Sequence, residues 1–355
     1  MKEEIHVVGA GLAGLAAAVN LAREGFRVLV RERQARIGGR PEVRPDPAGS
    51  PFDLERLAAY TGIDISPAVL PLKDCRYRLW DKTYRYPFPA NVSAYMVERG
   101  RRKSSLDSLL YETARREGVR FRFGDDVSGR AAFQALPPRS IIATGLEAES
   151  YQALGIPYEE TYSWCAKGKV SFREATVTIY MGPFTMDYGF SCTMNGIALG
   201  FVFQRARPLT PADREAFERK VEATETFRLA GWHEVRFGAC PSRSVRTPRL
   251  FWGDKILAGS AGGNMDPLLN FGMLGALVSG KVAATAVTRP REARREFLRL
   301  NLGYPPLLIL HRAFQRVPDR VRAWTAQRFV ETFNRLPERA QRQAYCFVPG
   351  YGRMG

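Results

Sequence analysis

Three glycines near the N-terminus constrain the fold of this chain more than any other feature. Residues 5–8 (Ile-His-Val-Val) have the composition of a short buried strand, and Gly9-Ala10-Gly11-Leu12-Ala13-Gly14 follows at once. An alanine- and leucine-rich helix is predicted from there to about Glu24, where Gly25 is the residue type of a left-handed cap. Phe26–Val30 is a second predicted strand. The chain therefore opens with a βαβ unit and a parallel sheet.

The spacing of these glycines suits a bound dinucleotide. Gly9 permits a tight turn, Gly11 lets the backbone approach a pyrophosphate, and Gly14 lets the helix pack on the strand. The helix N-terminus offers N–H groups and a partial positive charge to that pyrophosphate. Glu32 ends the second strand, where its carboxylate can accept hydrogen bonds from both ribose hydroxyls and would repel a 2′-phosphate. This pattern predicts FAD or NAD, against the alternative of an ordinary glycine-rich turn.

The segment 7–40 resembles the N-terminal signature of FAD-containing oxidoreductases of the glutathione-reductase-like superfamily. It reads VVGAGLAGLAAAVNLAREGFRVLVRERQARIGGR, and its last residues, Gly38-Gly39-Arg40, favour FAD over NAD. The resemblance implies that this spacing binds the ADP half of FAD. It also brings Arg33, Gly39 and Arg40 into the predicted cofactor site beside Glu32.

A second segment is similar to the RxxLDxxLxxxAxxxG helix of aromatic-ring hydroxylases and geranylgeranyl reductases. The matching residues are Leu106, Asp107, Leu110, Ala114 and Gly118. Lys103 stands where that family has arginine, near the flavin phosphates or ribityl chain. Lysine keeps the positive charge but loses the planar fork of donors, for which Arg101 or Arg102 could compensate. The alternative is a solvated basic turn.

A third segment, 256–273, is similar to the family's glycine-rich block beside the ribityl chain and the flavin pyrimidine edge. Ser260 replaces the family's aspartate and Asn270 replaces a glycine, which predicts weaker FAD binding. The alternative is a structural glycine-rich turn. The cofactor-binding residues implied by the whole resemblance are Gly9, Gly11, Leu12, Ala13, Gly14, Glu32, Arg33, Gly39, Arg40, Lys103, Ala143, Thr144, Gly145, Gly259, Ser260, Gly262, Gly272 and Met273.

The rest of the chain divides by composition. Its 355 residues give room for two lobes, or one large fold with an insert, at about 150 residues per domain. A stretch rich in proline and glycine, 38–51, is predicted as a loop. From about 160 to 250, aromatic and β-branched residues alternate around one predicted helix, 211–223, with Thr210 as its cap. Such alternation predicts an antiparallel sheet.

We therefore predict an α/β fold. It comprises a Rossmann-like FAD-binding domain with an inserted antiparallel β-sheet substrate domain and a C-terminal helical region. The FAD-binding domain is predicted to comprise 1–72, 103–158 and 248–290. The substrate domain comprises 73–102 and 159–247, and the C-terminal helical region comprises 291–355.

Charge is concentrated at the C-terminus. The net charge is +17, and from Arg289 onward 14 arginines face five acidic residues. Aromatic and apolar residues mixed with arginine over 321–336 predict a basic amphipathic helix on an anionic membrane surface. The alternatives are a helical cap with a solvated arginine face and, less favoured, nucleic-acid binding, for which no binding module is recognised. Five widely spaced cysteines and an acidic N-terminus without a signal pattern predict a cytoplasmic protein with reduced thiols and no metal site.

Within the superfamily the chain most resembles the geranylgeranyl-reductase-like group. Tyr188 and Phe190 stand where that group has tyrosine and tryptophan in a YxWxFPxxxG-like strand pair, although the FP pair is absent and core aromatics explain them equally well. The resemblance implies a reductase that saturates carbon-carbon double bonds of an isoprenoid or lipid by hydride transfer from reduced flavin. Tyr188 and Cys192 are the candidate proton donors.

Three features leave the reaction open. No second GxGxxG appears, and Ala143-Thr144-Gly145 lacks the DGxxS segment that assists nicotinamide access, so a separate electron donor, a reduced nicotinamide or a ferredoxin-like protein, is predicted. A flavoprotein monooxygenase or dehydrogenase of the same fold is the alternative enzyme. The departures at Lys103, Ser260 and Asn270 motivate a third alternative, a non-catalytic flavin-binding protein.

Overall fold

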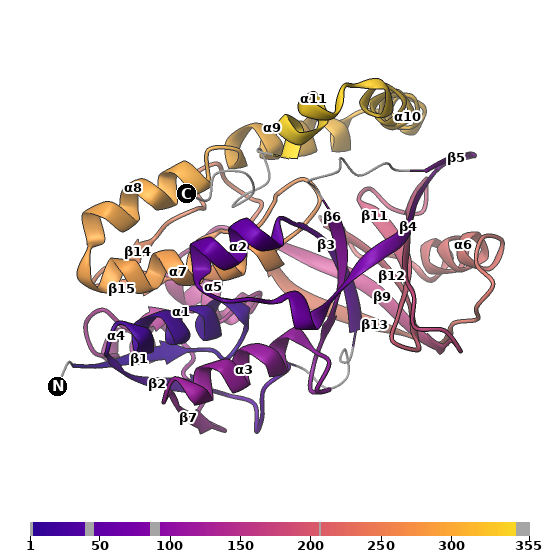
Figure 1. The fold of residues 1–355 in the computed structure, drawn as a ribbon. Helices are drawn as coiled ribbons and strands as arrows, with labels where there is room; N and C mark the ends of the chain where they lie inside the picture. Colours follow the sequence, from indigo (N-terminus) through magenta and orange to yellow (C-terminus); the bar gives the residue numbers. More distant parts are fainter. Residues whose placement is uncertain (1–2, 40–45, 86–92, 206, 346–355) are drawn as a thin grey trace.

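The computed structural model describes residues 3–39, 46–85, 93–205 and 207–345. Two β-sheets lie side by side, and helices from the C-terminal part of the chain run along the top of both (Figure 1). The structure confirms the predicted α/β fold, with a Rossmann-like sheet, a second sheet and a helical C-terminal region. In the described part of the chain no helix is both long and apolar enough to cross a membrane.

The first sheet contains the predicted βαβ opening. Strand β1 (Glu4–Val8) pairs in parallel with β2 (Arg27–Glu32) on one side and with β8 (Ile141–Ile142) on the other. The strands join in the order β14-β15-β8-β1-β2-β7. The remaining members are β7 (Arg120–Phe123), β14 (Phe251–Trp252) and β15 (Lys255–Leu257).

Helices α1 (Leu12–Arg23) and α7 (Met273–Thr288) pack against each other over this sheet. Their backbones approach closely because Gly280 has no side chain. A Cβ atom there would lie 2.5 Å from the Ala13 carbonyl oxygen. This contact brings the N-terminus of α7 beside the glycine turn. The other helices of this lobe are α2 (Leu54–Thr61), α3 (Leu106–Arg116), α4 (Arg130–Ala135) and α5 (Ala148–Leu154), with short 3₁₀ turns η1 (Ser66–Ala68) and η2 (Gly259–Gly262).

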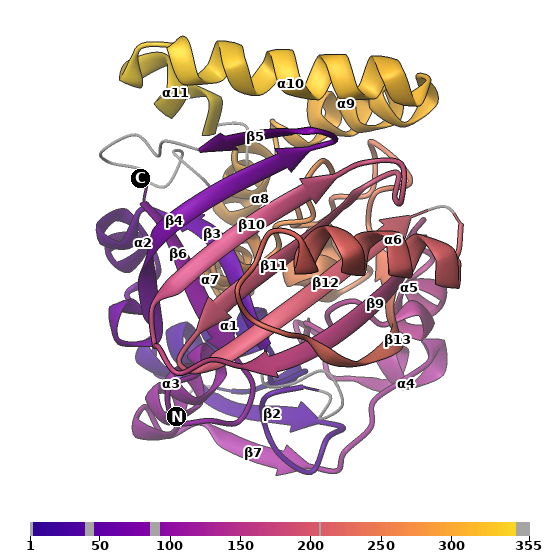
Figure 2. The same cartoon turned by 90° about the vertical axis from the view of Figure 1, so that its right-hand side faces the viewer.

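The second sheet has nine strands, in the order β13-β9-β12-β11-β10-β4-β6-β3, with β5 paired to β4. Helix α6 (Pro211–Glu222) covers its outer face (Figure 2), where Phe217 packs on the sheet and Thr210 forms the predicted cap in a capping box with Asp213. The strands are β3 (Asp46–Phe52), β4 (Val69–Leu79), β5 (Lys82–Arg85), β6 (Ser93–Arg99), β9 (Glu159–Lys169), β10 (Ala175–Met181), β11 (Tyr188–Met194), β12 (Ile197–Arg205) and β13 (Ala230–Cys240).

Two local expectations about this sheet are wrong. The sheet is mixed, because β4 and β10 run parallel; the chain passes through β5, β6 and much of the first lobe between them. The predicted loop 38–51 contains a strand, β3, despite Pro47 and Pro51. Proline is tolerated there because β3 is an edge strand that, among the described residues, pairs with β6 alone. β3 lies inside the segment assigned to the FAD-binding domain, yet it belongs to the second sheet.

As far as residue 345, the C-terminal region forms four helices, α8 (Pro290–Leu300), α9 (Tyr304–Arg316), α10 (Asp319–Arg335) and α11 (Glu338–Tyr345). Helix α10 lies across the end of the second sheet beside β4 and β5 (Figure 2). Trp80 Nε1 donates to Asp319, and Tyr84 donates to Glu331. Arg322 is buried and donates to the Thr185 carbonyl at 2.9 Å. This region is therefore fixed to the fold through one face of its helices.

Candidate functional site

A cavity of about 530 Å³ lies between the two sheets. On one side it is lined by the glycine turn, the end of β8, the 259–260 turn and the start of α7; on the other it is lined by the inner face of the second sheet. Both the predicted cofactor turn and the predicted substrate sheet therefore open onto a single space.

The glycine turn has the geometry that a bound pyrophosphate requires. Gly9 has a φ of +102°, and a Cβ atom there would lie 2.5 Å from the Ala143 carbonyl oxygen. At Gly14 a Cβ atom would lie 1.9 Å from the Gly9 carbonyl oxygen, so the helix sits directly on the turn. At Gly11 a Cβ atom would meet none of the described atoms within 4 Å, and this residue borders the cavity. The opening beside Gly11 is thus the space a phosphate can occupy.

Glu32, the last residue of β2, contacts this turn through its side chain. One carboxylate oxygen accepts from the Ala10 N–H at 2.8 Å and the other from the Gln34 N–H at 2.9 Å. Each oxygen keeps a further lone pair, so the carboxylate can still accept from the two hydroxyls of a ribose. The backbone holds the side chain at the edge of the turn, which is the position the adenosine sugar of a dinucleotide would need.

The other residues predicted beside the ADP half are placed differently. Arg33 pairs with Glu147 at 2.5 Å, and Glu147 borders the cavity, whereas Gly39 borders the cavity directly with a φ of +73°. Leu12 and Ala13 also line it. Arg40 lies outside the described residues.

The end of β8 contributes a polar group without a partner. Ala143, Thr144 and Gly145 all line the cavity, and Gly145 has a φ of +72°. The Thr144 hydroxyl is buried and has no hydrogen-bond partner among the described residues. Buried hydroxyls are nearly always paired, so this oxygen fits a ligand that supplies the missing hydrogen bond.

Lys103 is exposed and is absent from the described cavity lining. Arg99 lines the cavity instead, and its guanidinium donates to both oxygens of Asp107, at 2.8 and 2.9 Å. Asp107 is one of the matched residues of the α3 segment. The sequence therefore predicted the right region, but it predicted Lys103 where the structure has Arg99. The signal for this cation was the aspartate of the matched segment, because its two carboxylate oxygens suit a fork of donors that arginine supplies and lysine does not.

The glycine-rich block lies where the sequence places it, across the cavity from the second sheet. Gly259 has a φ of +64° and its N–H donates to Ser279. Ser260 lines the cavity, and its carbonyl accepts from Tyr151. Gly272 precedes the first turn of α7, where none of the described side chains caps the helix N-terminus. Of the other predicted residues in this block, Met273 lines the cavity, whereas Gly262 is buried behind it.

The two candidate proton donors differ in position. Tyr188 lines the cavity, but its hydroxyl donates to the Leu269 carbonyl at 2.5 Å. Burial raises the pKa of Tyr188 above its usual range, so the phenol stays protonated at neutral pH. Cys192 faces the same side of β11 but lies farther along the strand under Pro47, to whose carbonyl its thiol donates, and it is not among the described lining residues.

Sequence reasoning missed a third protonated group. Cys240 is buried at the end of β13, lines the cavity, and its thiol lies 2.9 Å from the Asn270 side-chain oxygen. Burial raises the pKa of Cys240, so the thiol is also protonated at neutral pH. Nothing in the local sequence marked it, because its proximity to Asn270 is set by the packing of the two lobes.

Comparison with known proteins gives one family match, at the N-terminal part of the chain, and three relatives that match over part of its length. Residues 7–70 match the NAD(P)-binding Rossmann-like domain family. Hydroxysqualene dehydroxylase of Rhodopseudomonas palustris is 52% identical over 40 residues, 11% of this chain and 10% of that protein. Flavin-containing monooxygenase FMO GS-OX5 of Arabidopsis thaliana is 30% identical over 125 residues, 31% of this chain and 27% of that protein. The chain thus spans about a quarter or less of the length of these two relatives.

A putative flavin-containing monooxygenase of Arabidopsis thaliana, FMO GS-OX-like 11, is 49% identical over 126 residues, 31% of this chain and 74% of that protein. Two of these three relatives are named as flavin-containing monooxygenases and the third as a dehydroxylase.

Solved structures match along the whole chain. A geranylgeranyl bacteriochlorophyll reductase-like protein of Thermoplasma acidophilum has a TM-score of 0.63 at 16% identity and covers 100% of this chain and 94% of its own. The p-nitrophenol 4-monooxygenase of Pseudomonas putida has a TM-score of 0.63 at 15% identity, with 97% of both chains covered. CtdE, solved in complex with FAD, has a TM-score of 0.58 at 12% identity and covers 93% of this chain and 99% of its own. The fold is therefore that of FAD-binding oxidoreductases.

Proposed function

The chain belongs to the FAD-dependent oxidoreductases, and from that premise we propose that it saturates carbon-carbon double bonds of an isoprenoid or lipid at a membrane surface. The observation that carries the proposal is the unequal lining of the cavity. Its charged lining residues in the described part of the chain are Asp46, Arg99 and Glu147, and none of them comes from β4 or β9–β13. One end therefore suits a charged cofactor and the other an apolar substrate.

The residues present fit FAD. Gly11 and the N-terminus of α1 would hold the pyrophosphate, and Glu32 the adenosine ribose. The Thr144 hydroxyl and Ser260 would face the ribityl chain, and the uncapped start of α7 would face the flavin ring. When bound and reduced, FAD supplies a hydride to one alkene carbon, and a reduced nicotinamide or ferredoxin-like donor restores its two electrons.

The protein supplies a dry wall and a proton. Among the described lining residues, the wall formed by β4 and β9–β13 carries three hydroxyls, those of Tyr77, Thr161 and Tyr188, and otherwise consists of apolar and sulfur-containing residues. A second alkene carbon needs a proton to balance the hydride. Tyr188 and Cys240 both carry one at neutral pH, and both border the cavity where they bond the 269–270 turn before α7, so they are the two donors that we propose. Saturation of each double bond then adds two hydrogens.

The membrane part of the proposal is supported by α9. Its buried face carries Leu308 and His311, whereas its exposed face carries Pro306, Ile309 and Leu310 at helical spacing. Ile309 is 61% exposed and Leu310 51%. An apolar stripe that faces away from the fold is unusual in a protein that has no partner for it.

Helix α10 adds an aromatic anchor with flanking cations. Trp324 is 63% exposed, and Arg320 and Arg328 lie one turn before and after it on the same face. Tryptophan prefers the interface between water and lipid, and each arginine near an anionic surface contributes about 1 kcal/mol. This combination favours anionic lipid over a neutral protein partner.

The reaction can be tested with the recombinant protein reconstituted with FAD and reduced with dithionite under nitrogen. We expect anaerobic incubation with a polyisoprenoid alcohol to give products heavier by two hydrogens for each double bond saturated. A wild-type protein that stays colourless after incubation with FAD would refute the proposal. Hydroxylated product formed only in oxygen would favour the monooxygenase alternative.

The membrane part can be tested by flotation with vesicles of phosphatidylcholine alone or with phosphatidylserine. We expect wild-type protein to float with the anionic vesicles and Trp324→Ser to remain largely in the soluble fraction. Phe172→Ser is the matched control, because Phe172 is also an exposed aromatic residue (37%) but lies between β9 and β10. Equal flotation of wild type and Trp324→Ser would overturn this part alone.

A further inference from the structure

A buried ion pair closes the end of the β11–β12 hairpin beside the cavity. Arg205 and Asp187 are 0% and 1% exposed at their side chains. The Arg205 backbone N–H donates to one Asp187 oxygen at 2.7 Å, and its Nε–H donates to the other at 3.0 Å. Taking both charges out of water is costly, and such pairs are often no more stabilising than apolar residues of the same size. Stability alone therefore does not explain this ion pair, which points to a further role.

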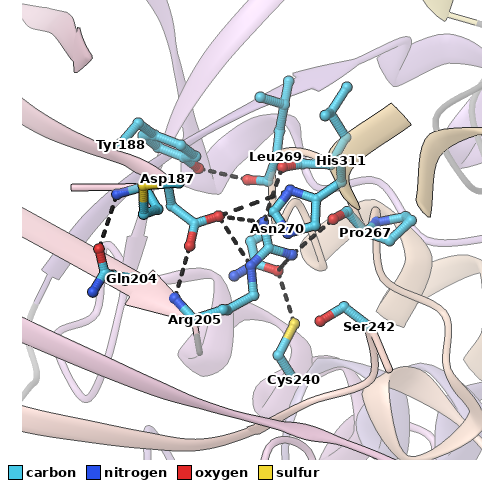
Figure 3. A network of polar contacts seen from close by, with 12 residues as sticks. Asp187, Tyr188, Gln204, Arg205, Cys240, Ser242, Pro267, Leu269, Asn270 and His311 are labelled. Atoms are coloured by element: carbon cyan, nitrogen blue, oxygen red, sulfur yellow. Dashed lines mark hydrogen bonds and ion pairs between the residues drawn. The ribbon is translucent and has the colours of Figure 1, made fainter. Parts of the chain in front are cut away.

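The same guanidinium reaches out of its own sheet into the glycine-rich block (Figure 3). Its Nη1 donates to the Pro267 carbonyl at 2.7 Å and to the Asn270 side-chain oxygen at 3.4 Å. Its Nη2 donates to the Leu268 carbonyl at 3.2 Å. Arg205 thus joins the substrate sheet to the 267–270 turn of the other lobe, and its planar fork lets one side chain hold several acceptors at once.

A third region meets at the same group. Arg205 Nη2 lies 3.1 Å from His311 Nδ1 on the buried face of α9 (Figure 3). Burial and the neighbouring Arg205 charge lower the pKa of His311 to about 3, so the imidazole is neutral and Nδ1 accepts. The guanidinium is therefore oriented from two sides, by Asp187 and by His311, while it holds the turn.

The turn that Arg205 holds borders the cavity at the start of α7. Leu269, Asn270 and Gly272 all line the cavity. Asn270 has a φ of +60°, a conformation that most side chains disfavour, and its side-chain oxygen is bonded by both Arg205 and Cys240. Tyr188 from the same sheet donates to the Leu269 carbonyl. Side chains of the substrate sheet thus bond the carbonyls of three successive residues of this turn.

We propose that Arg205 is a positioning residue for the flavin: by holding the 267–270 turn it fixes the backbone at the start of α7 against the flavin ring. The inference rests on the proposed function, since it needs FAD in the cavity. Arg205 itself is not among the described lining residues, so it acts through the turn. Backbone N–H groups at a helix start favour negative charge on the ring, so moving them changes the relative affinity for oxidised and reduced flavin.

Arg205→Lys is the test, because lysine keeps the charge beside Asp187 but cannot span both the aspartate and the turn carbonyls. Arg322→Lys is the matched control: Arg322 is also buried, at 2% exposure, and donates to the Thr185 and Met186 carbonyls, but it serves α10. Three readouts are the FAD dissociation constant, the visible circular dichroism of bound flavin and its reduction potential.

We expect Arg205→Lys to bind FAD at least tenfold more weakly, with an altered flavin circular dichroism band. We also expect the ratio of affinities for oxidised and reduced flavin to change about tenfold, which is about 30 mV for a two-electron couple. Arg322→Lys should lose thermal stability but keep all three flavin properties. Flavin properties within twofold of wild type in Arg205→Lys would overturn the inference.

If Arg205→Lys does not fold, a second variant tests the same inference. Asn270→Gly keeps the positive φ and the backbone of the turn but removes the oxygen that Arg205 and Cys240 share. We expect a smaller shift of reduction potential in the same direction, and an unchanged potential would overturn the inference. A wild type that binds no FAD would instead sink the proposed function, so the two failures are distinguishable.

Discussion

The two sides of the cavity differ in which atoms form them: mainly backbone atoms on the nucleotide side, and side chains on the substrate side. At the glycine turn the nucleotide side is made by backbone, and a side chain is excluded at two positions: a Cβ atom at Gly9 or Gly14 would lie within 2.5 Å of a carbonyl oxygen. On the substrate side the site is made by side chains on a sheet, such as Phe190, Phe201 and Phe203. A backbone-made site tolerates few residue types, whereas an apolar wall tolerates many. The contrast predicts where substitutions act sharply and where they act gradually.

The sharpest test of this contrast compares Gly14→Ala with Gly11→Ala. The added Cβ at Gly14 would lie 1.9 Å from the Gly9 carbonyl oxygen, so we expect a loss of about 3 kcal/mol or more in the free energy of unfolding. Gly11 has an ordinary φ of −81° and open space beside it, so its alanine variant should keep its stability within about 0.5 kcal/mol.

The same methyl group at Gly11 fills the space meant for the pyrophosphate, so we expect FAD binding to weaken at least tenfold. Thermal unfolding without FAD and titration of flavin fluorescence measure the two effects separately. If Gly11→Ala bound FAD as wild type does, the glycine turn would not be the phosphate site.

Glu32→Gln is expected to have the next largest effect. Both carboxylate oxygens accept from backbone N–H groups, Ala10 and Gln34. An amide has one oxygen, so its NH₂ group would face one of these donors and leave a polar group unsatisfied. We expect FAD affinity to fall by about 1 to 3 kcal/mol, or roughly 5- to 150-fold, by isothermal titration. Glu24→Gln, on the far end of α1, is the control and should bind normally.

The features that could be predicted from the sequence are mostly those of the nucleotide side, which depends on backbone conformation. The βαβ opening, the places of Gly9, Gly11, Gly14 and Glu32 and the start of α7 were all predictable, because each depends on local spacing and on backbone conformations that few residues adopt. The capping box at Thr210 was predictable for the same reason.

The rest depends on contacts between distant segments. Arg99 rather than Lys103 reaches the cavity because β6 pairs with β3 at its edge, and no local pattern encodes that pairing. Cys240, Asn270 and Arg205 meet only after the two lobes have packed together. The strand at β3 was missed because Pro47 and Pro51 end most strands and are tolerated only at a sheet edge.

The apolar wall offers a test of intermediate size. Ile179 lines the cavity on β10, and an asparagine there would place an unpaired amide in a dry wall. We expect the apparent KM for an apolar substrate to rise about tenfold, since about 1.4 kcal/mol of binding is lost, while the flavin spectrum is unchanged. Thr161→Val is the opposite change, because it removes a hydroxyl from the wall, and it should lower KM or leave it unchanged. A rise in KM for Thr161→Val would contradict an apolar substrate.

The smallest expected effects are pH dependences of stability at the junction of the two lobes. The buried His311 has a pKa of about 3, below its ordinary 6.5, so it binds its proton more readily in the unfolded chain and opposes folding as the pH falls below about 6.5. Burial raises the pKa of Asp266 to about 6 from 3.8, so the folded protein holds that proton more tightly, and stability falls as the pH rises from about 4 to 6.

These two slopes oppose each other between about pH 4 and 6, so the wild type should show only a shallow dependence on pH there. Replacing one of the two groups leaves the pH dependence of the other to be measured alone. In His311→Gln the free energy of unfolding should fall as the pH rises through this range, and in Asp266→Asn it should fall as the pH drops below about 6.5, each by about 1 kcal/mol per pH unit. Urea unfolding at pH 4.5, 5.5 and 7 measures both. Parallel curves for the three proteins would mean that neither group titrates differently on folding, and the junction would then be less buried than the side-chain contacts of Arg205 require.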